Sequence, residues 1–135
     1  MSDVNEPVQQ MTEEQCWERL GSTTFGRLAT AAVGDVQITP INYVVHDGRL
    51  VFRTAEGSKL ASLVVASRVA IEIDDVTTQS AWSVIGKGDA HVVHNMDEAD
   101  RLEELGLHPW VDTRKEVFVL VELDEVSGRV FALAR

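Results

Sequence analysis

A short segment between residues 52 and 59 combines residue types that can bind a phosphate group. It reads Phe52-Arg53-Thr54-Ala55-Glu56-Gly57-Ser58-Lys59, which predicts a strand, a glycine turn and a helix that starts at Ser58. Free backbone N–H groups and the helix dipole attract anions to such a helix start. Arg53 could bind phosphate oxygens bidentately, and Lys59 would add a point charge. The hydroxyl of Thr54 or Ser58 could donate a further hydrogen bond. The alternative is a routine capped helix with two solvated cations.

The charge of this region differs from that of the rest of the chain. Twelve Lys and Arg against 22 Asp and Glu give a formal net charge of −10, which disfavours nucleic acids and anionic membranes as partners. Residues 49–68, the basic island, have a net charge of +3, from Arg49, Arg53, Lys59, Arg68 and Glu56. The island suits a compact anion such as one phosphate group, unless its cations pair with surface carboxylates.

Two further segments could contact a flat cofactor. Pro40 interrupts a predicted strand, and a strand interrupted there can turn the backbone of Ile41, Asn42 and Tyr43 toward a ligand. An edge-strand proline with no other role is the alternative. Trp82 and Ser83 precede Gly86, where a ligand could approach the backbone, although a lone tryptophan is more often a packing residue.

The sequence offers no obvious catalytic nucleophile, general base or metal site. It contains no Walker loop, nucleophile elbow or dinucleotide fingerprint. If the protein is an enzyme, a bound cofactor is therefore expected to supply the chemistry.

The size and composition of the chain predict one domain over residues 1–135, with a flexible tail at residues 1–11. The chain has 135 residues, 44% of them hydrophobic, and one cysteine, Cys16, so an intrachain disulfide is excluded. Its apolar runs are shorter than the roughly 20 residues that span a bilayer. The N-terminus is polar and acidic, unlike a signal peptide. These features predict a cytoplasmic protein without a membrane partner.

Periodicity and turn signals predict a mainly β protein with three short helices. The helices are expected after the capping box Thr12–Gln15, from Ser58, and at residues 96–107. Strands are expected at residues 24–33, 36–46, 49–54, 69–74, 81–93, 117–123 and 130–134. Asp47-Gly48 predicts a type I′ hairpin, and Gly86 and Gly88 mark a bulge or close approach. So few helices cannot cover a large sheet, which favours an antiparallel barrel.

The order and spacing of these segments resemble the pyridoxamine 5′-phosphate oxidase-like family of flavin-binding split barrels. The resemblance covers most of residues 12–95. It is carried by Cys16–Leu20, Phe25–Ala29, Thr39–Tyr43, Leu50–Lys59, Val69–Asp74 and Ala81–Gly88. It implies a six-stranded antiparallel split barrel that forms a homodimer, with FMN bound at the dimer interface.

The resemblance also implies roles for individual residues. The cofactor phosphate would contact Phe52, Arg53, Thr54, Gly57, Ser58 and Lys59. The flat ring would contact Pro40, Ile41, Asn42 and Tyr43, while Trp82 and Ser83 would approach from the partner subunit or close the site.

The resemblance leaves the cofactor and the activity open. The leading interpretation is an FMN-dependent oxidoreductase that transfers hydride to or from a small molecule. A reductase using the deazaflavin coenzyme F-420 is an alternative, which the acidic charge of the chain disfavours. A flavin or haem carrier without activity is the other. The chain lacks the C-terminal segment typical of true pyridoxamine phosphate oxidases, so vitamin B6 phosphate is not the expected substrate.

Overall fold

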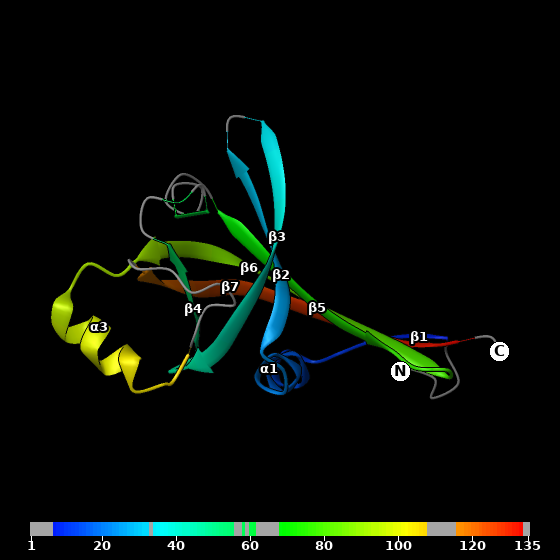
Figure 1. Ribbon diagram of the computed structural model, residues 1–135. Coiled ribbons are helices and arrows are strands. Elements are labelled where there is room, and N and C mark those ends of the chain that lie inside the picture. Colours follow the sequence, from blue (N-terminus) through cyan, green and yellow to red (C-terminus); the bar gives the residue numbers. More distant parts are fainter. Residues whose placement is uncertain are drawn as a thin grey trace.

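The computed structural model describes residues 7–32, 34–55, 58, 60–61, 68–107 and 116–133, with only the backbone of Ala32. Seven strands and two helices have defined bounds (Figure 1). They are β1 (Val8–Gln10), α1 (Glu13–Gly21), β2 (Phe25–Ala32), β3 (Asp35–His46), β4 (Arg49–Ala55), β5 (Val69–Val76), β6 (Ser80–Val92), α3 (Met96–Glu103) and β7 (Glu116–Ala132). No helix among these residues is long and apolar enough to cross a membrane.

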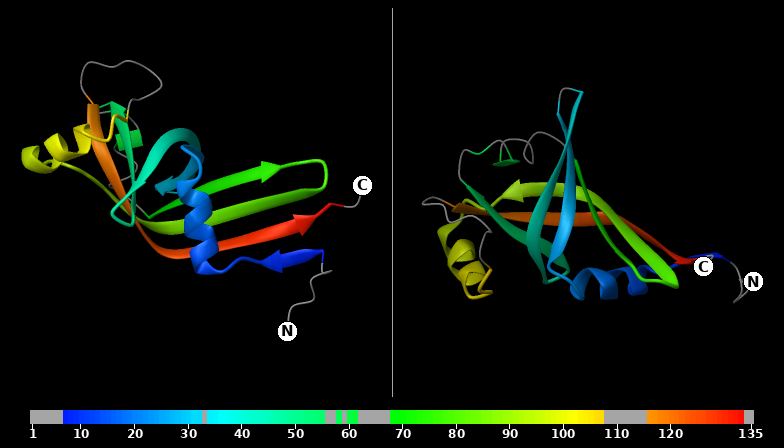
Figure 2. Two further views of the ribbon diagram at one scale, coloured as in Figure 1. Left: turned by 90° about the horizontal axis from the view of Figure 1, so that it is seen from below. Right: turned by 45° about the vertical axis from the view of Figure 1, so that its right-hand side comes forward.

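The strands form one antiparallel sheet that closes on itself. The strand order is β1-β7-β4-β3-β2-β5-β6, and β6 also pairs with β7. Six strands therefore form a ring, with β1 added outside it on the C-terminal half of β7. The prediction of a six-stranded antiparallel barrel is confirmed. Strands β5, β6 and β7 continue beyond the barrel as a long ribbon, and α1 lies across it (Figure 2).

Local sequence signals explain the main turns and helix ends. Thr12 and Gln15 form the predicted capping box at the start of α1. Asp47 and Gly48 have φ angles of 52° and 71°, as the predicted type I′ hairpin requires. The bulge predicted near Gly88 is also confirmed, because the register of β6 and β7 shifts between Lys87 and Gly88.

Two apolar clusters fill the space inside and beside the barrel. The larger cluster lies inside the barrel and includes Leu28, Tyr43, Phe52 and Ile71, all at most 1% exposed. Tyr43 donates a hydrogen bond of 2.8 Å from its hydroxyl to the Leu20 carbonyl at the end of α1, and burial raises the pKa of Tyr43. The smaller cluster lies under α3 and contains Val51, Val93, Leu102, Leu107, Phe118 and Leu120.

Two predictions about the chain ends are wrong. The predicted strands at residues 117–123 and 130–134 are parts of one strand, β7. Ser127-Gly128 is not a turn, because Gly128 continues the pairing with β6 opposite Val84. Residues 8–10 are not a flexible tail, because they pair with Arg129–Phe131 as β1. Most of the predicted helix from Ser58 lies outside the described residues.

Candidate functional site

The structure brings together the two hydroxyl groups of the predicted phosphate segment. The Oγ1 atom of Thr54 lies 3.2 Å from the Oγ atom of Ser58. Ser58 Oγ accepts a hydrogen bond of 3.1 Å from the backbone N–H of Ala61, as an N-cap residue does. The predicted capped helix start at Ser58 is therefore present. Gly57 and Lys59 lie outside the described residues.

Arg53 points away from this pair of hydroxyls. Successive side chains of a strand face opposite sides, and Phe52 is buried inside the barrel. Arg53 therefore faces α3, where its guanidinium lies 4.5 Å from the centre of the Phe118 ring. Its nitrogens lie 3.0 Å from carboxylate oxygens of Glu103 and Glu116. Only 13% of the Arg53 side chain is exposed, so this arrangement is a partly buried ion-pair cluster.

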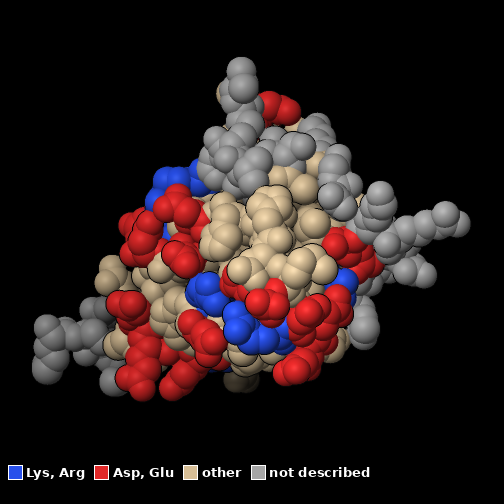
Figure 3. Space-filling model, turned by 90° about the vertical axis from the view of Figure 1, so that its left-hand side faces the viewer, with Lys and Arg blue, Asp and Glu red and all other residues tan. Residues whose placement is uncertain are grey.

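Other cations of the basic island are also paired with carboxylates. Arg68 forms two hydrogen bonds of 2.7 Å with Asp124, and these lower the pKa of the Asp124 carboxyl. Arg49 lies 3.9 Å from both Glu98 and Glu122. Figure 3, seen from the side that carries α3, shows carboxylates gathered around a smaller number of cations. Within the described residues, the island therefore contains no cluster of unpaired positive charge.

The predicted ring-binding segment divides between the two faces of β3. Ile41 and Tyr43 are buried inside the barrel, at 5% and 0% exposure, while Pro40 is exposed and Asn42 is half-buried. The N–H of Tyr43 donates to Thr24 on the β2 side, so alternation directs the nitrogen of Pro40 to the other side. In the described part of the chain, β4 pairs with β3 only from Tyr43 onward. Pro40 therefore removes no sheet hydrogen bond there.

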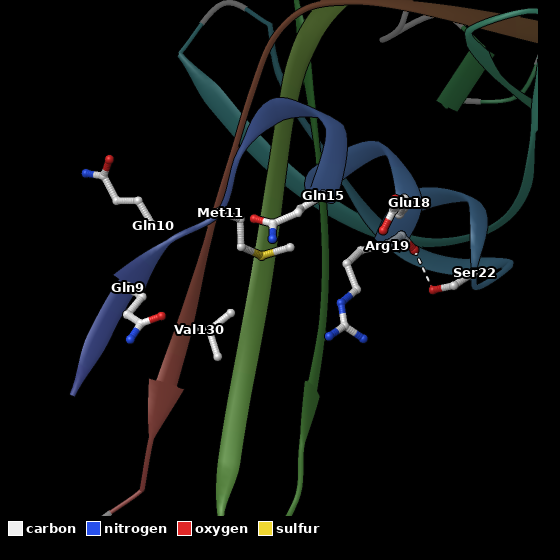
Figure 4. A pocket seen from close by; sticks show the side chains of 8 residues that line it. All are labelled: Gln9, Gln10, Met11, Gln15, Glu18, Arg19, Ser22 and Val130. Atoms are coloured by element: carbon white, nitrogen blue, oxygen red, sulfur yellow. Dashed lines mark hydrogen bonds between the residues drawn. The ribbon is translucent and has the colours of Figure 1, made fainter. Parts of the chain in front are cut away.

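Trp82 and Ser83 also lie on opposite faces of their strand. Trp82 packs against the barrel core, and the Arg19 guanidinium of α1 lies 4.7 Å from its ring centre. Beside Arg19, β1 and α1 border a polar hollow of about 470 Å³ that is lined mainly by uncharged side chains (Figure 4). Ser83 lines a different hollow, on the far side of β6. One ligand on one protomer therefore cannot contact both side chains.

The described structure carries an exposed apolar surface that the sequence did not predict. We call it the outer face: the side of β2, β3, β5 and β6 that points away from the barrel interior. It carries Phe25, Val36, Ile38, Val76 and Ile85, which are 41–68% exposed. The register places them on one face, since Ile38 pairs with Ala29 and Glu72 with Ile85. The sequence contains a signal for this surface. The apolar residues of β3 occupy alternate positions up to Ile38, but from Ile41 onward they occupy the other set of alternate positions, which faces the opposite side of the strand.

A shallow hollow of about 410 Å³ lies in the outer face. Its residues are Arg27, Ala29, Ile38, Ala70, Glu72, Asp74 and Ile85. Arg27 lies 2.9 Å from Glu72 and 3.6 Å from Asp74. Burial and the neighbouring Asp74 raise the pKa of Glu72, and Arg27 opposes this shift. The hollow therefore has an apolar floor and a charged border, which suits a flat, largely apolar ligand with polar edges.

Comparison with known proteins identifies the family to which this barrel belongs. The family described as pyridoxamine 5′-phosphate oxidase matches residues 12–130. The chain belongs to the pyridoxamine 5′-phosphate oxidase-like family. Its barrel is accordingly a split barrel of that family, as its resemblance predicted.

Known relatives and solved structures are similar to this chain over nearly its whole length. The Mycobacterium tuberculosis protein Rv0080 is 31% identical over 95% of this chain and 89% of its own length. A solved Corynebacterium glutamicum protein that bears the name of the same oxidase is 32% identical, with a TM-score of 0.84, over 98% of this chain and 100% of its own. An FAD-binding protein from Mycobacterium smegmatis is 34% identical, with a TM-score of 0.83, over 93% of this chain and 100% of its own.

Proposed function

We propose that this protein is an oxidoreductase that binds a flavin nucleotide, FMN in the first instance, on its outer face. The observation that carries the proposal is the hollow of about 410 Å³ with its apolar floor of Ala29, Ile38, Ala70 and Ile85. Pro40 pairs with Arg27 at its border, so Pro40 and the part of β3 that has no β4 partner in the described chain adjoin the hollow. These features fit a planar ring system. A flavin bound there would supply hydride transfer to or from a small substrate.

The phosphate of the cofactor is assigned to the helix start after β4. Thr54 and Ser58 offer adjacent hydroxyls, and Gly57 and Lys59 complete the segment in the sequence. Phe52, Ile41 and Tyr43 support this region from inside the barrel, where all three side chains are buried. Hydroxyls at a helix start next to a lysine are suitable donors to a phosphate group.

FAD is the second candidate cofactor, because the 34% identical solved protein from Mycobacterium smegmatis is described as FAD-binding. The formal charge of −10 favours either flavin over F-420, whose tail carries several carboxylates. A flavin carrier without activity would use the same hollow, and turnover with a reduced cofactor and an acceptor distinguishes it from an enzyme.

Absorption spectroscopy of the purified protein tests the cofactor. After incubation with FMN, FAD or F-420 and desalting, we expect retained flavin bands with FMN or FAD. Lys59→Met should weaken the binding of FMN by about 1.5–3 kcal/mol. The binding of riboflavin, which lacks the phosphate, should remain nearly unchanged. Retention of F-420 alone, or of none of the three, would contradict the proposal. Equal losses of binding free energy for FMN and riboflavin would show that Lys59 does not contact the phosphate.

We further propose that two copies of this protein pair through their outer faces. The exposed apolar side chains there lie on one side of the sheet, and an apolar patch on a soluble protein commonly marks an interface. The patch also carries both signs of charge, Arg27 against Glu72 and Asp74. A surface with both signs can complement a second copy of itself across a twofold axis. In such a dimer the hollow would lie between the protomers, where water is excluded.

Sedimentation of two matched variants tests the dimer. Ile38 is 68% exposed on the outer face, and Met96 is 74% exposed at the start of α3. We expect Ile38→Asp to raise the dissociation constant of the dimer at least about a hundredfold, because it places a charge in an apolar interface. Met96→Asp should leave the dimer intact. A monomeric wild-type protein, or equal effects of both variants, would overturn this interface.

A further inference from the structure

The outer face continues onto β7, where it has a second hollow that is more polar than the first. This hollow measures about 280 Å³ and is lined by Ser83, Ile85, Ser127, Gly128, Arg129 and Phe131. Ile85 also lines the apolar hollow, so the two hollows adjoin. In the register, Ser83 lies opposite Arg129, and Ile85 lies opposite Ser127. Directly opposed residues share a face, so two hydroxyls and one guanidinium converge on the same side of the ribbon.

Helix α1 does not cover this hollow. Gly128 lies between Ser127 and Arg129, and a Cβ atom on it would come within 2.9 Å of the Sγ atom of Cys16 in α1. The helix therefore packs on the opposite face of β7 (Figure 2), and Ser127 and Arg129 point away from it. Both residues are exposed.

The side chain of Arg129 has no partner among the described residues, which is unusual in this acidic chain. Among the arginines that the structure describes, Arg27, Arg49, Arg53 and Arg68 lie near carboxylates and Arg19 stacks on Trp82. In the described ranges, only the side chains of Arg101 and Arg129 make no hydrogen bond, ion pair or ring contact. Arg129 pairs with Ser83 of β6, and Ser83 in turn pairs with Asp74 of β5. Asp74 is therefore the first carboxylate in this line of paired residues, two strands away from Arg129. It is held instead by Arg27.

We propose that Arg129, together with the hydroxyls of Ser83 and Ser127, binds the carboxylate or phosphate of a ligand whose flat apolar body lies over Ile85. A guanidinium can donate two parallel hydrogen bonds to such a group, and the serines can donate further ones. The adjoining apolar hollow accepts the uncharged part. In assigning an anionic redox substrate to this face, the proposal rests on the proposed function.

A matched pair of probes tests the subsite without any flavin. The probes are 2-naphthoate and 2-naphthamide, which share a flat ring system and differ in charge. Titration calorimetry on the wild-type protein should show a preference for the carboxylate of about tenfold, as expected for one charged hydrogen-bonded contact. Arg129→Gln should abolish the preference, and Ser127→Ala should reduce it. Arg101→Gln, which removes the other described arginine whose side chain has no partner, should preserve it.

The possible results separate this proposal from the proposed function. Equal binding of the two probes by the wild type, or an unchanged preference in both Arg129→Gln and Ser127→Ala, would overturn the subsite. Suppose that the wild type retains no flavin and that Arg129→Gln loses the preference for the carboxylate. This result would support the subsite and reject flavin binding. In protein that retains flavin, the affinities of Arg129→Gln for FMN and for riboflavin show whether Arg129 contacts the cofactor phosphate or the substrate. An unchanged affinity for FMN supports an anionic substrate at Arg129, whereas weaker binding of FMN with unchanged binding of riboflavin would overturn that assignment.

Discussion

Replacing Gly88 with alanine is expected to lower the free energy of unfolding by about 3 kcal/mol. An ideal Cβ atom on Gly88 would lie 1.9 Å from the backbone oxygen of Glu122 and 2.7 Å from its carbonyl carbon. Both contacts are with backbone, which cannot rotate away as a side chain can. The strands must therefore separate where β6 pairs with β7, and this pairing closes the barrel.

The bulge beside Gly88 makes this separation costly. Lys87 pairs with Glu125 and Gly88 with Leu123, so Asp124 is the extra residue of β7. Arg68 holds Asp124 through two hydrogen bonds of 2.7 Å. Moving β7 outward would therefore disturb this pair as well as the backbone pairing.

Gly21→Ala is the matched control for this substitution, and chemical denaturation measures both. Nothing lies within 4 Å of a Cβ atom on Gly21, which is the last residue of α1. Alanine is the better helix former, so we expect no loss and a gain of up to about 0.5 kcal/mol. Similar losses for the two variants would show that the close approach at Gly88 is not the cause.

Signals confined to a few neighbouring residues predicted the local structure well. The capping box of Thr12 and Gln15, the Asp47-Gly48 turn and the bulge at Gly88 all act within one turn or one strand pair. Their residue types suffice, because the interacting atoms are close in sequence. The scarcity of predicted helices favoured an antiparallel barrel, and the family resemblance added that it is a six-stranded split barrel, which no local signal specifies.

Predictions that depended on packing between distant segments failed. Ser127-Gly128 has the composition of a turn, yet Gly128 stays in β7. The absence of a side chain there serves the close approach of Cys16 and Met11, whose sulfur atoms would lie within 3 Å of an added Cβ. A single sequence does not distinguish a glycine that lets a helix pack closely on a strand from a glycine that forms a turn. The strand β1 similarly depends on β7, some 120 residues later.

The outer face was missed for a related reason. Val36 and Ile38 are as apolar as the core residues Ile41 and Tyr43, but they lie on the opposite side of the strand. The phase change at Pro40 indicates that β3 has apolar side chains on both faces. A chain that covers the outer side of β3 would have buried these residues, and among the described residues none does so. Only the folded arrangement distinguishes a second core from an exposed surface.

Arg53→Met is expected to cost about 2–3 kcal/mol of unfolding free energy, through loss of its ion pairs rather than of packing. Methionine can retain the contact of the side-chain stem with Phe118. Glu116 is only 10% exposed and would lose the guanidinium that lies 3.0 Å from its carboxylate. Glu103, in α3, is 55% exposed and can be solvated by water. Most of the cost should therefore come from Glu116.

A double-mutant cycle tests this origin by chemical denaturation. Adding Glu116→Gln to Arg53→Met removes the buried charge that has lost its guanidinium and should recover at least half of the loss. Arg27→Met is the control: Arg27 is 46% exposed and also lies 2.9 Å from a carboxylate, and we expect a cost below about 1 kcal/mol. No recovery in the double variant would show that the buried charge is not the source of the loss.

The same variant decides between the two roles of Arg53. The sequence predicts a phosphate contact, and the structure places the side chain between β4, α3 and β7. If Arg53 holds α3 in place, Arg53→Met should weaken FMN and riboflavin by the same factor or leave both unchanged. If it reached the phosphate, only FMN would be weakened. Strand alternation favours the first result, because Phe52 would have to leave the core before Arg53 could turn toward Thr54 and Ser58.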